Sequence, residues 1–315
     1  MKMQWRGVMP ALTTAFSQDL NVDLDFIGRH SNWLVDNGCT GIVALGSLGE
    51  GATLAAAEKR DILSTCVRAV GSRVPVIAGI SALTTQDAVT LAKTAEDTGC
   101  AGLMVLPPYV YVGDWREMKA HVTAVFKATP LSCMLYNNPI AYTVDFLATQ
   151  VKELVEENGN LHAIKESSAD VRRVTALRAL LGERLDVLMG VDDAIVESVA
   201  VGAVGWIAGL VNAFPRESVA LFEMAKNGRT SEAIELYRWF LPLLRMDTVP
   251  KFVQLIKLVQ QEAGVGSARV RPPRLELTGA EFDEARAIIS DALSTRPKHA
   301  SSTAFRQSTE AAAVR

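Results

Sequence analysis

The sequence predicts an α/β protein, a (β/α)8 TIM barrel with a C-terminal helical appendage. Eight short apolar runs alternate with longer segments of helical periodicity, as expected for parallel strands that are buried on both faces. A glycine-containing phrase also recurs along the chain. We expect the strands at residues 6–13, 41–46, 75–80, 102–107, 132–137, 162–166, 185–190 and 205–209.

The recurring phrase indicates a repeated β/α unit. DNGCTGIV at residues 36–43 returns as DTGCAGLM at 97–104, and its core returns as GAVGWI at 202–207. In each copy one glycine would end a helix in the left-handed conformation and a second would open a strand. The main alternative is an open doubly wound sheet, but GSLGEG at 46–51 has the wrong glycine spacing for a dinucleotide-binding fingerprint.

The chain divides into three parts. Residues 1–228 would form the barrel, and residues 229–295 a helical extension packed on it, with helices near 231–245, 249–263 and 279–293. We expect this extension to serve assembly or bracing rather than chemistry. Residues 296–315 are rich in Ser, Thr, Ala and charge, which is typical of a disordered tail.

Composition excludes several classes of function. A formal net charge of −3 without a basic cluster argues against nucleic-acid binding. The four cysteines lack metal or disulfide spacing, and the histidines form no metal-ligand pattern. No signal core or membrane-spanning run is found, so we expect a reduced, cytoplasmic enzyme with no membrane partner.

Lys165 points most directly to chemistry. It follows the apolar run LHAI at 161–164, and Tyr136 ends a similar run twenty-nine residues earlier, about one β/α unit away. Both side chains could therefore project from the same ends of adjacent strands. Alone, Lys165 could simply mark where a strand meets solvent. Apolar surroundings favour a neutral amine that attacks carbonyls, however, and a tyrosine can shuttle a proton, so the pair suggests Schiff-base chemistry on a 2-oxo acid.

Other polar groups follow the expected strands. The loop after the second strand could present backbone N–H groups and the Ser47 hydroxyl to a carboxylate, or it could be a tight turn whose glycines need positive φ. Glu50 more plausibly braces this turn than acts as an acid or base. Asp192 and Asp193 are expected to start a helix, because carboxylates favour helix N-termini.

Three motifs together resemble those of the dihydrodipicolinate synthase / N-acetylneuraminate lyase family. They are GSLGE at 46–50, YNNP at 136–139 and IKE at 164–166. The resemblance covers about residues 5–293, including the helical extension. Each motif is weak alone, but the three in this order are specific.

The resemblance implies roles for five residues. Lys165 would form a Schiff base with a 2-oxo acid such as pyruvate, and Tyr136 would shuttle protons. Ser47 would bind the substrate carboxylate with nearby backbone amides, including that of Leu48, and the Ile207 carbonyl would line the pocket. The family needs no metal or organic cofactor, because the lysine imine is the electron sink. It usually forms tetramers, so we expect a homo-oligomer.

Departures from dihydrodipicolinate synthase itself argue against a lysine-biosynthetic synthase. That enzyme typically has a second threonine where this chain has Leu48, and a second relay tyrosine where it has Val110. Its arginine clamp for the second substrate is replaced by Ala141, which Tyr142 follows. Losing a charged clamp and a relay member should each cost orders of magnitude in rate.

The segments LPPYVY at 106–111, YNNPIAY at 136–142 and GWIAGL at 205–210 are more similar to the 1-pyrroline-4-hydroxy-2-carboxylate deaminases of hydroxyproline breakdown. This resemblance implies release of ammonia and 2,5-dioxopentanoate. One alternative is a pyruvate-dependent aldolase or a 4-hydroxy-tetrahydrodipicolinate synthase-like enzyme, acting on a 4-hydroxy-2-oxo acid or a 2-keto-3-deoxy sugar acid. A remote alternative is a non-catalytic barrel that binds a 2-oxo acid.

Overall fold

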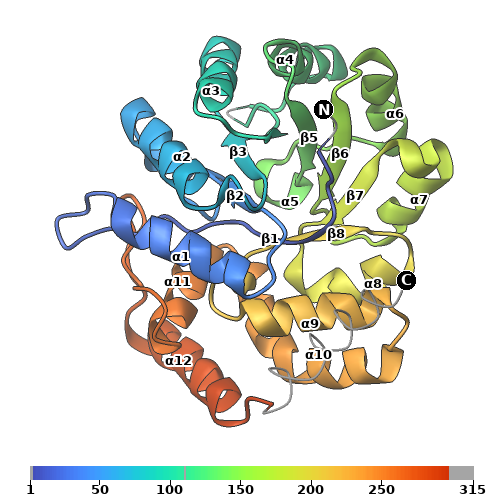
Figure 1. Ribbon diagram of the computed structural model, residues 1–315. Helices are drawn as coiled ribbons and strands as arrows, with labels where there is room; N and C mark the ends of the chain where they lie inside the picture. The colour runs from blue at the N-terminus through green and yellow to red at the C-terminus, as the bar shows by residue number, and fades with distance from the viewer. Residues whose placement is uncertain (1–2, 110, 298–315) are drawn as a thin grey trace.

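The strands form the centre of the molecule and the helices surround them (Figure 1). The structure is a computed structural model that describes residues 3–109 and 111–297. All strand pairs between neighbours are parallel. The strands are β1 (Gly7–Pro10), β2 (Ile42–Ala44), β3 (Val76–Ile80), β4 (Gly102–Val105), β5 (Ser132–Asn137), β6 (Leu161–Glu166), β7 (Asp186–Met189) and β8 (Gly205–Ala208).

The sheet is a nearly closed barrel. Its strands follow the order β1-β8-β7-β6-β5-β4-β3-β2. An isolated parallel bridge joins Ala11 to Val43, and the Leu12 N–H donates to the Val43 carbonyl at 2.8 Å, so β1 also meets β2. The predicted (β/α)8 barrel is confirmed. Each observed strand lies within its predicted run, except that β6 begins one residue earlier.

Helices follow each strand, and the recurring glycines end three of them. Gly38, Gly99 and Gly202 have φ of +98°, +86° and +110°, the left-handed conformation that the sequence predicted.

The helices outside the barrel wall are α1 (Leu24–Asp36), α2 (Ala56–Val70), α3 (Thr85–Asp97), α4 (Trp115–Lys127), α6 (Ala148–Glu157), α7 (Arg172–Leu181), α8 (Ile195–Ala200) and α9 (Pro215–Lys226), and α5 (Pro139–Tyr142) is a single turn after β5.

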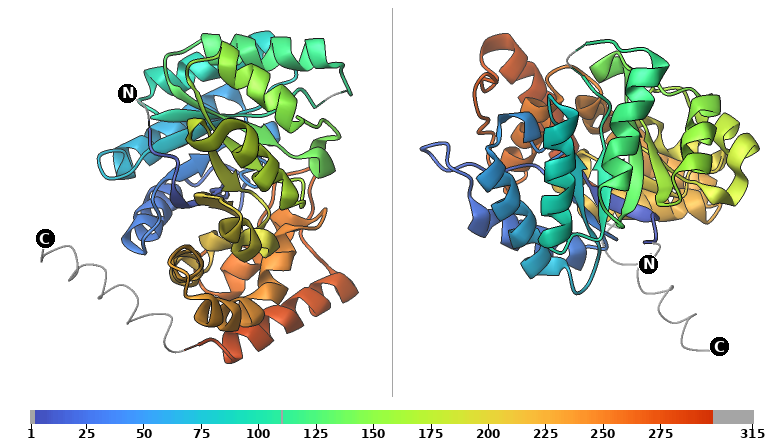
Figure 2. Two further views of the ribbon diagram at one scale, coloured as in Figure 1. Left: turned by 90° about the vertical axis from the view of Figure 1, so that its right-hand side faces the viewer. Right: turned by 90° about the horizontal axis from the view of Figure 1, so that it is seen from above.

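Three further helices form the C-terminal extension. They are α10 (Thr230–Leu244), α11 (Phe252–Glu262) and α12 (Gly279–Ser294). α10 packs on α8 and α9, and Figures 1 and 2 show the three gathered on one side of the barrel. Of the expected disordered tail, residues 298–315 lie outside the described residues. None of the described helices is both long and apolar enough to cross a membrane.

Candidate active site

β5 and β6 place Tyr136 beside Lys165. The two residues are direct partners in the parallel register, and both are buried, with 4% and 6% of their surface exposed. The Lys165 Nζ lies 4.4 Å from the centroid of the Tyr136 ring. The sequence predicted this neighbourhood, and the barrel puts it at the carboxyl ends of the strands, where active sites of this fold lie.

The next residue on each strand fixes the strand ends. Because strand side chains alternate between faces, Asn137 and Glu166 point away from the Tyr136–Lys165 pair. The Asn137 side-chain amide donates to Glu166 at 3.0 Å, and the Ser168 backbone N–H donates to Glu166 at 2.7 Å. Burial raises the pKa of Glu166. These contacts hold both strand ends in a defined position.

A glycine after β7 makes room for the lysine. A Cβ atom at Gly190 would lie 2.4 Å from the Lys165 Cε and 2.0 Å from the Ser167 Oγ. The Ser167 hydroxyl is buried and has no hydrogen-bond partner in the described part of the chain. Any larger residue at position 190 would displace the Lys165 side chain.

Tyr142 connects the aromatic side chains to the loop after β2. Its hydroxyl forms a short hydrogen bond with the Ser47 hydroxyl. Its ring meets Tyr136 edge to face, with centroids 5.9 Å apart, and Tyr109 at 5.8 Å. Burial raises the pKa of Tyr142. In the sequence Tyr142 only follows Ala141 and ends the YNNPIAY segment, so its contact with Ser47 is a site feature that sequence reasoning missed.

The loop after β2 offers free donors. Among the described residues, the backbone N–H groups of Ser47 and Leu48 donate no hydrogen bond within the protein. The Leu48 side chain is buried in the core, so the backbone is the part of this residue that can contact a ligand. Ile207 lies in β8 and its side chain is also buried. The binding roles of these three residues remain predictions.

The glycines of this loop do not have the conformation that the tight-turn interpretation gave them. Positive φ occurs at Leu45 (+65°) and Glu50 (+53°), and not at Gly46 or Gly49. Gly49 is needed for close approach instead, because a Cβ atom there would lie 2.8 Å from the Leu12 carbonyl oxygen.

Glu50 braces the loop against the C-terminal extension. One of its carboxylate oxygens lies 2.7 Å from the Lys257 Nζ, and the other accepts from the Arg271 backbone N–H at 3.0 Å. Both charged side chains are buried. Burial lowers the pKa of Lys257, although the charge of Glu50 opposes the shift. Both carboxylate oxygens of Glu50 are thus occupied, as the bracing interpretation expected.

Asp192 supports the end of β8. It begins the short 3-10 helix η3 (Asp192–Ala194), as expected, but its side chain does not cap that helix. Its carboxylate accepts from the Trp206 indole N–H at 2.9 Å and from the backbone N–H groups of Gly209 and Leu210 at 3.1 and 2.9 Å. Burial raises its pKa to about 6, against the effect of these donors.

The extension also brings a carboxylate to this region. Asp247, just after α10, has a buried Oδ1, and the charges of Lys165 and Asp192 act on it. No spacing or motif marks Asp247 in the sequence, so sequence reasoning missed it. Val110, at the position of the family's second relay tyrosine, lies outside the described residues.

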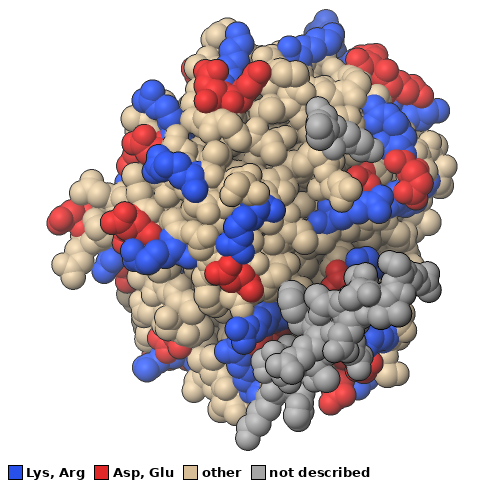
Figure 3. Space-filling view, viewed as in Figure 1, with Lys and Arg blue, Asp and Glu red and all other residues tan. Residues whose placement is uncertain are grey.

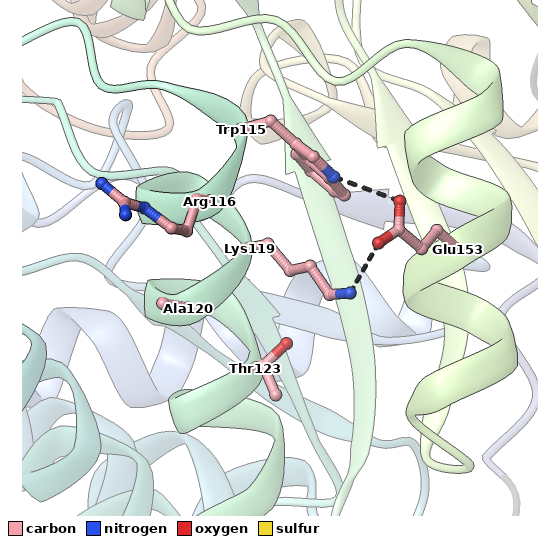
Figure 4. Close-up of a pocket in the computed structure, with 6 residues that line it drawn as sticks. All are labelled: Trp115, Arg116, Lys119, Ala120, Thr123 and Glu153. Carbon is pink, nitrogen blue, oxygen red and sulfur yellow. Dashed lines mark hydrogen bonds and ion pairs between the residues drawn. The ribbon is translucent and has the colours of Figure 1, made fainter.

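The pocket in Figure 4 is a different feature. It lies between α4 and α6 and is lined by Trp115, Arg116, Lys119, Ala120, Thr123 and Glu153. Glu153 already accepts hydrogen bonds from Trp115 at 3.1 Å and Lys119 at 2.5 Å. We therefore place the candidate site at Lys165, where unpaired polar groups meet a nucleophile.

The described residues include no cluster of metal-ligating side chains. Within the described ranges, no group of three or more His, Cys, Asp or Glu could hold a metal ion. Figure 3 shows acidic and basic side chains interspersed on the face that it presents.

Comparison with known proteins identifies the family. The sequence model of the Dihydrodipicolinate synthetase family matches residues 4–292. A 4-hydroxy-tetrahydrodipicolinate synthase of Methanocaldococcus jannaschii is 29% identical over 289 residues, covering 92% of this chain and 98% of that protein. Another, from a Chelativorans species, is 32% identical over 239 residues, covering 76% and 82%.

Solved structures show the same relationship. The 4-hydroxy-tetrahydrodipicolinate synthase of Methylacidiphilum fumariolicum matches with a TM-score of 0.88 and 28% identity, covering 92% of this chain and 97% of that one. A dihydrodipicolinate synthase of Bacillus anthracis also matches at 0.88 and 28%, covering 94% and 100%. The chain described here therefore belongs to the dihydrodipicolinate synthetase family.

Proposed function

We propose that this chain is a Schiff-base-forming deaminase whose substrate is 1-pyrroline-4-hydroxy-2-carboxylate. The observation that carries the proposal is the buried pair of Lys165 and Tyr136, with Nζ 4.4 Å from the ring centroid. A nucleophilic amine beside a proton-shuttling phenol suits covalent catalysis on a C=N or C=O carbon next to a carboxylate.

The reaction follows from these groups. Ser47 and the free N–H groups beside it hold the carboxylate, and the Lys165 amine attacks C2 of the cyclic imine. The ring C2–N bond then breaks, so that C2 is joined to Lys165 by an iminium and the former ring nitrogen becomes an amine on C5. Tyr136 takes the C3 proton, because the Lys165 imine withdraws the electron pair of the C3–H bond. The 4-hydroxyl then leaves as water. Transfer of one proton each from C5 and its nitrogen to C3 and C4 removes the C3=C4 bond and converts the C5 amine into an imine. Hydrolysis of the C2 and C5 imines by two water molecules then releases ammonia and 2,5-dioxopentanoate and restores the lysine.

A second candidate is supported by the relatives, which are named 4-hydroxy-tetrahydrodipicolinate synthase. That synthase, or a pyruvate-dependent aldolase, would share Lys165 and Tyr136. Against it stand Leu48 and Ala141, where the family pattern has a hydroxyl and a carboxylate-binding arginine. The Ala141 residue is exposed and uncharged, so it offers a second carboxylate no clamp.

Borohydride reduction followed by intact-mass analysis tests the proposal. Wild type, Lys165→Ala and the surface control Lys119→Ala are each incubated with 1-pyrroline-4-hydroxy-2-carboxylate or pyruvate. We expect an adduct with the pyrroline in wild type and Lys119→Ala, none in Lys165→Ala, and ammonia release lowered about a thousandfold or more in Lys165→Ala. An adduct with pyruvate alone would favour the synthase or aldolase, and turnover by Lys165→Ala would refute Schiff-base catalysis at this lysine.

We also propose that the chain forms a homo-oligomer, with four subunits as in its family. Apolar side chains are exposed on two loops that touch through Tyr109 and Tyr142. These are Tyr111, Val112 and Ile140, with 57%, 69% and 66% of their surface exposed. Exposed apolar patches indicate contact surfaces. Light scattering should give four times the mass of one chain, and Ile140→Glu should lower it, whereas a wild-type mass of one chain would contradict the proposal.

A further inference from the structure

Asp247 is a carboxyl group that the chemistry above leaves unused. It ends the short 3-10 helix η5 (Arg245–Asp247), which directly follows α10. Its Oδ1 is buried and has no hydrogen-bond partner among the residues that the structure describes. Burying a carboxyl oxygen without a donor costs free energy, so such an atom in a native fold calls for a functional explanation.

The end of β8 is shaped to admit this carboxyl group. A Cβ atom at Gly209 would lie 2.1 Å from the Asp247 Oδ1 and 2.5 Å from its Cγ. The Gly209 backbone N–H is itself bonded to Asp192, so the backbone here cannot easily move away. Glycine at position 209 thus lets the C-terminal extension insert a carboxyl group at the carboxyl end of the barrel.

The groups around Asp247 favour its protonated form. Burial and the negative charges of Asp192 and Asp193 raise its pKa well above the ordinary value, and the positive charge of Lys165 opposes this only in part. Asp192 is less suited to donate a proton, because both of its carboxylate oxygens already accept hydrogen bonds from three N–H donors. Asp193 lies 3.6 Å from Arg245 in an ion pair. Asp247 is therefore the carboxyl group in this cluster that can hold a proton to give away.

We propose, resting on the proposed function, that Asp247 is the acid that protonates the leaving 4-hydroxyl group. After Tyr136 has taken the C3 proton, the Lys165-bound substrate is an enamine with a C2=C3 bond. The nitrogen lone pair re-forms the iminium, the C2=C3 pair becomes a C3=C4 bond, and the C4–O bond breaks. The oxygen takes the Asp247 proton and leaves as water. The Asp247 carboxylate then regains a proton, equal to the one lost from C3, through Tyr136 or solvent.

The test separates elimination from the steps before it. Wild type, Asp247→Asn, Gly209→Ala and the exposed control Asp36→Asn, at the end of α1, are compared in three measurements: the borohydride-trapped adduct, ammonia release, and deuterium uptake at C3 of 1-pyrroline-2-carboxylate, which lacks the hydroxyl. In Asp247→Asn we expect a normal adduct and normal exchange but ammonia release lowered at least about a hundredfold. Gly209→Ala should likewise keep a normal adduct and normal exchange but lose ammonia release, because its Cβ displaces the carboxyl group. The control Asp36→Asn should stay within about threefold of wild type in all three measurements.

The outcomes distinguish the two proposals. Ammonia release by Asp247→Asn within about threefold of wild type would overturn the assignment of Asp247 alone. Loss of adduct and exchange together with turnover, in a variant whose circular dichroism is unchanged, would also overturn it, since Asp247 would then act by positioning Lys165. A wild-type chain that forms no adduct with either pyrroline would overturn the proposed function, and this assignment with it.

Discussion

At the scale of single residues, Tyr142 contacts the Ser47 hydroxyl, to which we assign substrate binding. The two hydroxyl groups share one hydrogen bond, so one of them directs its proton at the other and the orientation of Ser47 is fixed. In Tyr142→Phe the Ser47 hydroxyl would be free to rotate. We expect KM for the pyrroline to rise about ten- to a hundredfold, which corresponds to the free energy of one hydrogen bond to a charged group. Steady-state ammonia release measures this.

The adduct assay gives Tyr142→Phe its control. If Tyr142 acts through Ser47, the Lys165 adduct still forms at saturating substrate, and Ser47→Ala combined with Tyr142→Phe is little worse than either change alone. The exposed Tyr111→Phe should leave KM unchanged. Additive effects of the two substitutions would instead mean that Tyr142 contacts the substrate independently of Ser47.

At the scale of elements, contacts between adjacent strands could be predicted from the sequence, whereas contacts made by the packing of distant segments could not. Tyr136 and Lys165 end two apolar runs one β/α unit apart, and parallel pairing alone then places them side by side. The contact of Ser47 with Tyr142 depends on how the single turn α5 packs. Asp247 reaches the barrel because α10 packs on α8 and α9. Neither packing arrangement leaves a periodicity in the sequence, so those residues could not be found there.

His30 offers a test of how helix α1 docks on α11. Its ring is stacked between Phe26 and Trp33, and its Nε2 lies 3.4 Å from the Gln260 side-chain nitrogen. Burial lowers its pKa to about 4. The unfolded chain binds a proton near pH 6.5 but the folded chain only near 4, so the free energy of unfolding falls as pH falls through this window.

The size of this effect can be measured by urea unfolding at pH 7 and pH 4. The shift corresponds to about 3 kcal/mol of stability that is present above pH 6.5 and lost on acidification. Carboxylates also contribute to acid unfolding, so the comparison is with His30→Gln, which cannot titrate. We expect the variant's loss of stability between the two pH values to be smaller by about that amount. Equal losses in both proteins would show that His30 has the same pKa in the folded and in the unfolded chain.

At the scale of the whole molecule, a buried ion pair attaches the C-terminal extension to the face of the barrel that carries the candidate site. Lys257 of α11 donates to the carboxylate of Glu50 in the loop after β2 and to the Arg269 carbonyl. Arg271 adds an ion pair to Glu58 at 2.8 Å. The loop that carries Ser47 is thus held between the barrel and the extension, so the extension influences the site even where it does not enter it.

A double-mutant cycle on Glu50 and Lys257 measures this attachment. Removing one partner leaves a buried charge unpaired, so Glu50→Gln and Lys257→Met should each lower the free energy of unfolding by about 3–5 kcal/mol. The double variant should be far more stable than the sum of the two losses implies, because no charge is left unpaired. Lys251→Met is the matched control: its ion pair with Glu281 is about half exposed, and its loss should cost about 0–1 kcal/mol. Urea unfolding of the four proteins gives the coupling free energy, and strict additivity of the two buried substitutions would mean that the extension is held by its apolar contacts alone.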